Sequence, residues 1–220
     1  DVSDDDISYF VVECKQSDGV WKSVSRTSTN LGVNLSGLTP EHDYVYRVIG
    51  YDKRSNRGTP SEEITVTTLK DTICPKVTKI TPDPGYFKSE INLRFTAEDD
   101  YRVKSIEIQT STDKESWKTV SEIKATGESA KCTFDCKLDL KNYEEGSVFV
   151  RAKVYDSYGN VTEDKDLTCY EYVVDRTAPI QPTGVTASSG ETEGGSSFVN
   201  ISWNAITDDN SFAYYRVYKS

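Results

Sequence analysis

The chain has 220 residues, of which 35% are hydrophobic and 28% charged, and its net charge is −10 at pH 7. This acidic balance disfavours nucleic acid and anionic membranes as partners, because both require clustered lysine and arginine. No apolar run approaches the ~18 residues of a membrane-spanning helix, and with His42 as the only histidine imidazole-rich metal sites are excluded, so we expect neither membrane insertion nor an enzyme.

Stretches in which apolar and polar residues alternate run along the whole chain. Alternation with a period of two is typical of a half-buried β-strand. In chain order, the predicted strands are residues 10–14, 44–48, 64–68, 91–97, 131–140, 148–154, 170–174 and 199–203. Turn residues such as Ser17-Asp18-Gly19 separate them, and no segment has the apolar period of a helix. The predicted fold class is all-β, with tandem immunoglobulin-like β-sandwiches.

An internal repeat predicts where the domains change. Six residues recur 104 positions later: Arg47, Tyr51, Asp52, Asn56, Asp71 and Pro75 as Arg151, Tyr155, Asp156, Asn160, Asp175 and Pro179. A repeat of about 100 residues matches one immunoglobulin-sized sandwich. The repeat ends in Asp-x-x-x-Pro, which predicts a linker because proline stiffens the chain between domains. The predicted domains are residues 1–69, 70–176 and 177–220.

A shorter repeat concerns the two end domains. Residues 7–12, ISYFVV, are similar to residues 212–217, FAYYRV, which lie 205 positions further along. The chain therefore ends at about the strand with which it begins. We expect the first domain to lack its opening two strands, and the third domain to contain only its first strands.

Two regions resemble the fibronectin type III family. Leu38-Thr39-Pro40 followed by residues 44–48, YVYRV, is similar to the signature before and along the family's sixth strand. In that family the tyrosine that matches Tyr44 forms a tyrosine corner, in which its hydroxyl bonds back to the upstream backbone. Residues 182–185 and 199–203 resemble the first two strands. The resemblance gives structural roles to Leu38, Pro40, Tyr44 and Trp203, with Trp203 as the core indole.

Residues 70–176 resemble bacterial immunoglobulin-like modules, on phrases such as FTAEDD at 95–100 and VYDSYGN at 154–160. The whole arrangement resembles tandem modules of large secreted or surface proteins of Gram-positive-type bacteria. It implies an extracellular or cell-surface location and a non-catalytic spacer or adhesion role beside neighbouring domains of the parent chain. One alternative is an accessory module of an enzyme or toxin that binds carbohydrate or a host or cell-surface protein. Another is a filament-forming subunit that exchanges strands head to tail.

Two kinds of residue are candidates for ligand binding. Trp21 and Trp117 follow polar turns, and an exposed indole there would stack on sugars, although each indole would also serve to cover a sheet. Among three acidic clusters, at residues 4–6, 98–100 and 208–210, the best calcium candidate is Glu98, Asp99 and Asp100, since calcium prefers carboxylate oxygens. None has the spacing of an EF-hand loop, and the alternative is a solvated loop. No other cofactor is expected.

The five cysteines are Cys14, Cys74, Cys132, Cys136 and Cys169, without a CxxC pair. Cys132 and Cys136 share the parity of Phe134 and Leu138, which predicts that both thiols pack in a core as small hydrophobic groups. The alternative is an inter-strand disulfide from one of them to Cys169 or Cys74. An odd number leaves at least one thiol without an intramolecular partner.

Overall fold

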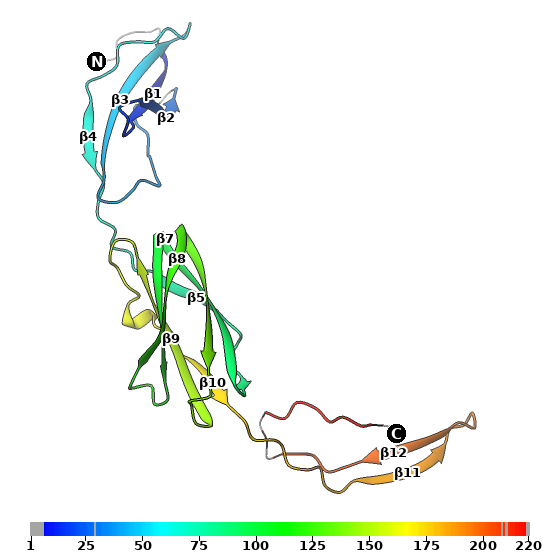
Figure 1. Cartoon of the computed structure of the whole chain (residues 1–220). Helices are drawn as coiled ribbons and strands as arrows, with labels where there is room; N and C mark the ends of the chain where they lie inside the picture. The colour runs from blue at the N-terminus through cyan, green and yellow to red at the C-terminus, as the bar shows by residue number, and fades with distance from the viewer. Residues whose placement is uncertain (1–6, 29, 208, 210, 219–220) are drawn as a thin grey trace. The chain divides into compact units, whose positions relative to one another are not determined.

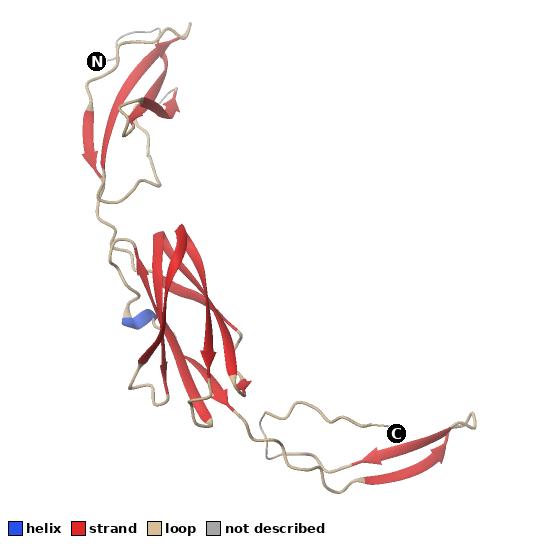
Figure 2. Ribbon diagram, viewed as in Figure 1, coloured by secondary structure: helices blue, strands red, loops and turns tan. Residues whose placement is uncertain are grey.

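The computed structural model describes residues 7–28, 30–207, 209 and 211–218 (Figure 1). Its elements are β-strands, apart from one short 3-10 turn, η1 (Asp164–Asp166), so the fold is all-β as predicted (Figure 2). None of the described residues forms a helix with the length and apolarity that a membrane span requires. The chain divides into two compact units, residues 1–73 with 158–160 and residues 74–157 with 161–220.

The first unit contains one four-stranded antiparallel sheet in the order β2-β1-β3-β4. Its strands are β1 (Ile7–Lys15), β2 (Trp21–Thr27), β3 (Asp43–Asp52) and β4 (Ile64–Thr67). Strand β2 was not predicted, because Trp21 and Val24 are its only apolar residues. It pairs with β1 across a bulge between Val12 and Glu13.

The two faces of this sheet differ in how well they are covered. Because side chains alternate along a strand, Val11 and its β3 partner Ile49 lie on one face, and Val12 and its partner Val48 lie on the other. Val11 and Ile49 are buried, whereas the Val48 side chain is 40% exposed. The second face is therefore the incompletely covered one.

The second unit begins with a larger sheet in the order β5-β7-β9-β10-β6, in which β8 pairs with β7. Its strands are β5 (Lys76–Thr81), β6 (Tyr86–Phe87), β7 (Glu90–Ser111), β8 (Lys118–Asp139), β9 (Gly146–Asp156) and β10 (Tyr170–Val174). All pairs are antiparallel except β10 with β6. These strands include the predicted segments 91–97, 148–154 and 170–174, and residues 131–139 of the predicted segment 131–140.

Strands β7 and β8 are 22 residues long and take part in both layers of the sandwich. The first half of β7 pairs with β5 and with the end of β8, and its second half pairs with β9 and with the start of β8. Register shifts between Glu98 and Val103 mark the passage from one layer to the other. Residues 98–100 interrupt the apolar alternation there, which is why the sequence pattern predicted a strand only up to residue 97.

One continuous core fills this sandwich. It consists of 18 buried residues contributed by β5, β7, β8, β9, β10 and the residue after β8, with Phe95, Ile108, Val150 and Tyr172 among the fully buried ones. Cys136 belongs to this core and Cys132 packs against it, as their shared parity predicted. All five cysteines are free thiols, so the alternative disulfide is not formed.

The last two strands, β11 (Thr186–Glu191) and β12 (Ser197–Ser202), form an antiparallel hairpin that pairs with no other strand among the described residues (Figure 1). Thr186 pairs with Ser202, and Glu191 pairs with Ser197 at the turn. The sequence located the second of these strands, but β11 follows residues 182–185 instead of including them.

Candidate functional site

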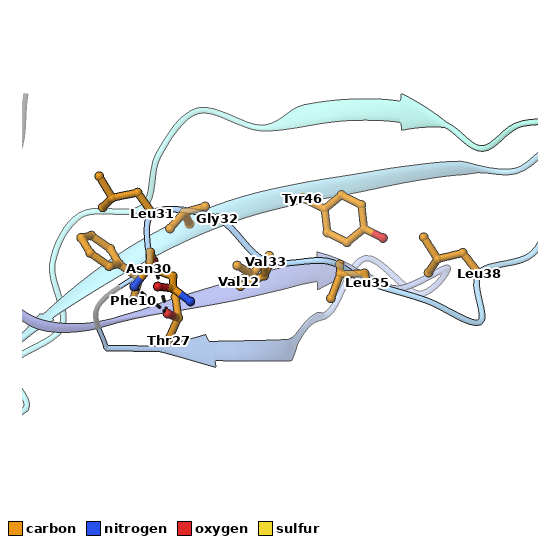
Figure 3. A pocket seen from close by; sticks show the side chains of 11 residues that line it. Phe10, Val12, Thr27, Asn30, Leu31, Gly32, Val33, Leu35, Leu38 and Tyr46 are labelled. Carbon is orange, nitrogen blue, oxygen red and sulfur yellow. Dashed lines mark hydrogen bonds between the residues drawn. The ribbon is translucent and has the colours of Figure 1, made fainter.

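An apolar groove of about 420 Å³ lies on the incompletely covered face of the first unit (Figure 3). Not one of its lining residues carries a charge. They are Phe10, Val12, Thr27, Asn30, Leu31, Gly32, Val33, Leu35, Leu38, Tyr46 and Val48. The groove is the principal candidate for a binding surface in this unit, because apolar surface that stays open on a folded domain commonly marks an interaction site.

The sequence builds this groove from two kinds of segment. Alternation places Phe10 and Val12 of β1, with Tyr46 and Val48 of β3, on one face of the sheet. Residues 30–38, which form no strand, run along that face and supply leucine and valine side chains (Figure 3). The run starts at a turn in which the Asn30 N–H donates to the Thr27 hydroxyl oxygen and that hydroxyl donates to the Asn30 carbonyl, both at 3.2 Å.

The sandwich of the second unit, formed by β5 to β10, has a face that corresponds to the groove, and there that face is covered. Arg47 pairs with Glu13 and the repeated Arg151 pairs with Gln109, which matches Val12 to Ile108 and Val48 to Ala152. Ile108 and Ala152 are buried in the core, which also contains residues of β5 and of the first half of β7. The first unit has no counterpart of these two strands among its described residues. The groove therefore lies on the face that corresponds to the core-facing side of β7 and β9 in the second unit.

The predicted structural residues lie at one end of the groove. The Tyr44 hydroxyl accepts a hydrogen bond from the Thr39 N–H at 2.9 Å, five residues upstream, which is the geometry of a tyrosine corner. Leu38 lines the groove, and Pro40 is half-buried next to Thr39. The corner ties the segment that crosses the open face to the start of β3.

Trp21 lies on the opposite face of this sheet. The Arg47 guanidinium carbon is 4.0 Å from the centre of the indole, and Lys15 is also placed over the ring. Arg47 also forms an ion pair with Glu13, whose carboxylate oxygen is 2.7 Å from the guanidinium nitrogen Nη2. The indole is half-buried and forms part of an intramolecular stack.

Trp117 has the same arrangement in the second unit. The Arg151 guanidinium carbon is 3.9 Å from the centre of its ring, and Arg151 donates to the Gln109 side chain at 2.8 Å. The indole N–H donates to the Lys114 carbonyl oxygen. Sequence reasoning named both tryptophans but not the arginines over them, although Arg47 and Arg151 stand in the repeat. Sugar stacking on Trp21 or Trp117 stays a prediction, and it has to compete with these guanidinium groups for the indole faces.

The half-buried carboxylate of Glu107 accepts further hydrogen bonds beside this stack in the second unit. Glu107 accepts hydrogen bonds from the Thr119 hydroxyl, the Gln109 amide and the Tyr155 hydroxyl. These hydrogen bonds, that of Thr119 above all, hold the pKa of Glu107 below its usual value, although partial burial acts in the opposite direction. The same contact with Glu107 raises the pKa of Tyr155.

The three acidic residues at positions 98–100 have different environments. Glu98 forms an ion pair with Lys131, and its pKa is lowered mainly by that hydrogen bond. Asp99 accepts the backbone N–H groups of Tyr101 and Arg102, and Asp100 is exposed. Calcium binding by these three residues stays a prediction. Of the other two clusters, residues 4–6 and residues 208 and 210 lie outside the described residues.

Trp203 lies in the third predicted domain, directly after β12. It is half-buried, and its ring packs against Tyr215 at a centroid distance of 5.1 Å. Both residues line an apolar hollow together with Val185, Ile201 and Val217. The predicted core indole thus contacts the segment that follows the hairpin.

Comparison with known proteins identifies one stretch of the chain. Residues 2–67 match the family model of the Fibronectin type III domain. No curated protein matches the chain. Two solved structures are each similar at 16% identity. The fibronectin(III)-like modules of Clostridium thermocellum CbhA match 79% of this chain and 82% of their own, with a TM-score of 0.32. The FN1-FN3 domains of chicken CNTN1 match 92% of this chain and 67% of their own, with a TM-score of 0.41. The stretch that contains the apolar groove is therefore the one similar to a fibronectin type III domain.

Proposed function

We propose that the chain is a non-catalytic, extracellular spacer or adhesion segment of a large bacterial surface or secreted protein. Its modules connect neighbouring domains of the parent chain and keep them apart, and they catalyse no reaction. The fibronectin type III similarity of residues 2–67 and the all-β architecture support this proposal. The immunoglobulin-like character of residues 70–176 belongs to the same proposal.

The observation that carries the proposal is that the repeated residues make contacts that stabilise the fold. Arg47 and Arg151 each stack on a tryptophan. Tyr51 and Tyr155 each form a bridge to the residue six positions later, Arg57 and Val161. A repeat that preserves packing residues is what a tandem structural module requires, because a domain of this size has its own core and its own stabilising contacts.

Asp52 is the clearest case among the repeated residues. One of its carboxylate oxygens accepts the N–H groups of Arg54 and Asn56, and the other accepts the Asn56 side-chain amide at 2.7 Å. These bonds lower the pKa of Asp52, the Asn56 side chain contributing most. Both carboxylate oxygens therefore stabilise the turn that follows β3.

The extracellular location can be tested on intact cells. Antibodies raised against the 220-residue chain should label unpermeabilised cells of the source organism or its culture medium, and brief protease treatment of the cells should remove the label. Labelling that appears only after permeabilisation would contradict the proposal. A hydrolase activity of the purified chain that disappears on substitution of a specific side chain would contradict the non-catalytic part.

The second candidate function is a carbohydrate-binding accessory module. The observation in its favour is that Trp21 and Trp117, both half-buried, each lie under an arginine of the repeat, one in each of the two units. A glycan array probed with the wild-type chain and with Trp117→Ala tests it, with Phe149→Ala as a control that removes another aromatic side chain of the second unit. Binding that is lost only in Trp117→Ala, with unchanged secondary structure, would favour this candidate over the spacer.

A further inference from the structure

We propose that residues 175–177, which leave the sandwich of the second unit directly after β10, are fastened to it by an exit clamp formed by Glu145 and Arg176. Glu145 then decides whether this part of the linker is held or released. The inference deepens the proposed spacer role and rests on it for its purpose, because a spacer needs a fixed direction at each joint. All the contacts of the clamp lie within the second unit.

The first part of the exit clamp is the side chain of Arg176. Its Nη2 atom donates to the Leu140 carbonyl oxygen at 2.7 Å and to the Tyr143 carbonyl oxygen at 3.0 Å. Hydrogen bonds from a charged donor are stronger than those between neutral groups. The guanidinium therefore holds the linker to the turn that follows β8.

The second part of the exit clamp is the carboxylate of Glu145, which binds the linker with both oxygens. Oε1 accepts the backbone N–H of Arg176 at 2.9 Å, and Oε2 accepts the hydroxyl of Thr177 at 2.8 Å. Asp175 adds two contacts, since its N–H donates to the Phe87 carbonyl oxygen and its Oδ1 atom accepts the Thr177 N–H, both at 3.0 Å. Three successive linker residues are thus hydrogen-bonded.

The turn that receives the guanidinium is itself anchored in the core. Leu140 is fully buried, and its N–H donates to the Ser89 carbonyl oxygen at 2.9 Å. The Tyr143 N–H donates to the Leu140 carbonyl oxygen at 3.0 Å, and the Tyr143 hydroxyl lies 2.8 Å from the hydroxyl of Thr110. A turn fixed in this way restrains the linker that is bound to it.

The first unit holds the segment after β4 at the corresponding loop positions. The residues 104 positions before Tyr143 and Glu145 are Thr39 and Glu41. The Thr39 carbonyl oxygen accepts the hydroxyl of Thr68 at 2.6 Å, and the Glu41 N–H donates to the carbonyl oxygen of the residue after Thr68 at 3.2 Å. Different donors therefore fasten the chain to equivalent loop positions in the two units, which supports a common purpose of these contacts.

The exit clamp determines how much of the linker is free to move. While it is closed, the path of the chain is fixed relative to the sandwich as far as Thr177, and residues 178–180, which include Pro179, are exposed. Opening it would release three further residues, which extend the reach of the linker by about 10 Å. A spacer is therefore shorter and stiffer at this joint with the clamp closed.

Limited digestion of the 220-residue chain with trypsin tests the exit clamp, because trypsin cleaves after arginine and the Arg176–Thr177 bond lies inside the clamp. Glu145→Ala removes both carboxylate acceptors. Glu144→Ala is the matched control, since Glu144 is exposed and makes no hydrogen bond or ion pair with any residue that the structure describes. Cleavage after Arg176 should be at least about tenfold faster in Glu145→Ala than in the control, as expected for the loss of two hydrogen bonds. Equal rates in the two variants would overturn the proposal.

Hydrogen exchange separates opening of the exit clamp from unfolding of the sandwich. Thr177→Val removes one donor to Glu145 at an exposed position outside the core, so it tests the clamp even if Glu145→Ala folds poorly. Exchange of the Arg176 amide should accelerate several-fold in both variants, while the amides of β9 keep their wild-type protection. An unchanged Arg176 amide, or equal acceleration along β9, would overturn the proposal. Labelling of intact cells tests the spacer role separately, so failure of the clamp and failure of that role are distinguishable.

Discussion

The guanidinium of Arg47 stacks on the indole of Trp21 at 4.0 Å, and the repeat places Arg151 on Trp117 at 3.9 Å. In the sequence, the two arginines are 104 residues apart and the two tryptophans are 96 apart. The spacing differs because β8 has 22 residues whereas β2 has 7, yet the sheets restore the same contact. The pair is thus a property of the sheet and explains why arginine recurs at these positions.

The first prediction concerns this stack. Arg151→Ala should lower the free energy of unfolding of the second unit by about 1–2 kcal/mol, because it removes a cation–π contact of ~0.5–1 kcal/mol and a hydrogen bond to Gln109 of similar value. Denaturant unfolding followed by the fluorescence of Trp117 measures the change. Arg94→Ala is the control, since its ion pair with Asp135 is well exposed and should contribute little. The same loss in both variants would refute a special role for the stack.

A second prediction follows from the tyrosine corner. Tyr44→Phe keeps the ring but removes the oxygen that accepts the Thr39 N–H. The first unit should lose about 1 kcal/mol of stability, the usual contribution of one such hydrogen bond. Tyr9→Phe retains the ring that stacks on Tyr51 at 4.8 Å and should be near neutral. Thermal unfolding monitored at Trp21 distinguishes the two, and an unaffected Tyr44→Phe would remove the corner from the list of stabilising contacts.

The third prediction concerns a close backbone approach in the first unit. A Cβ atom added to Gly58 would lie 2.9 Å from the Gly50 carbonyl oxygen, which accepts the Gly58 N–H. Gly58→Ala should therefore destabilise the unit by about 1–3 kcal/mol, as overpacking commonly does. Gly32→Ala, where the added methyl meets no atom within 4 Å, is the control. Equal midpoints in urea for the two variants would show that the backbone adjusts without cost.

The fourth prediction is a pH dependence that arises from Tyr172. Burial above all raises the pKa of its phenol from 10.0 to about 12, and its hydroxyl donates to the Pro82 carbonyl oxygen. In the unfolded chain the phenol ionises near pH 10, so the contribution to stability is complete below that value and declines as the pH rises towards 12. Tyr172→Phe should show a shallower loss of stability between pH 10 and 12, measured by urea unfolding. Parallel curves for the two proteins would contradict the shifted pKa.

The local sequence determined most of the strands, because alternation is a property of neighbouring residues. Segment 91–97 alternates strictly and segment 148–154 alternates apart from Phe149, and both lie in strands whose apolar side chains are buried. Strand β2 escaped prediction because it lies at the edge of its sheet with mostly polar side chains. Strand β5 escaped too, since Val77 and Ile80 are out of step across a bulge.

The repeats showed which positions of the modules correspond, and the resemblance located the tyrosine corner and Trp203. Only the tertiary structure revealed that Arg47 lies over Trp21, that Glu107 gathers three donors, and that Val12 and Val48 face an open groove. An alternating strand presents two faces, and whether a face is buried depends on strands that are remote in sequence. Local residues therefore specify the strand, whereas the covering layer decides which of its side chains remain available for a partner.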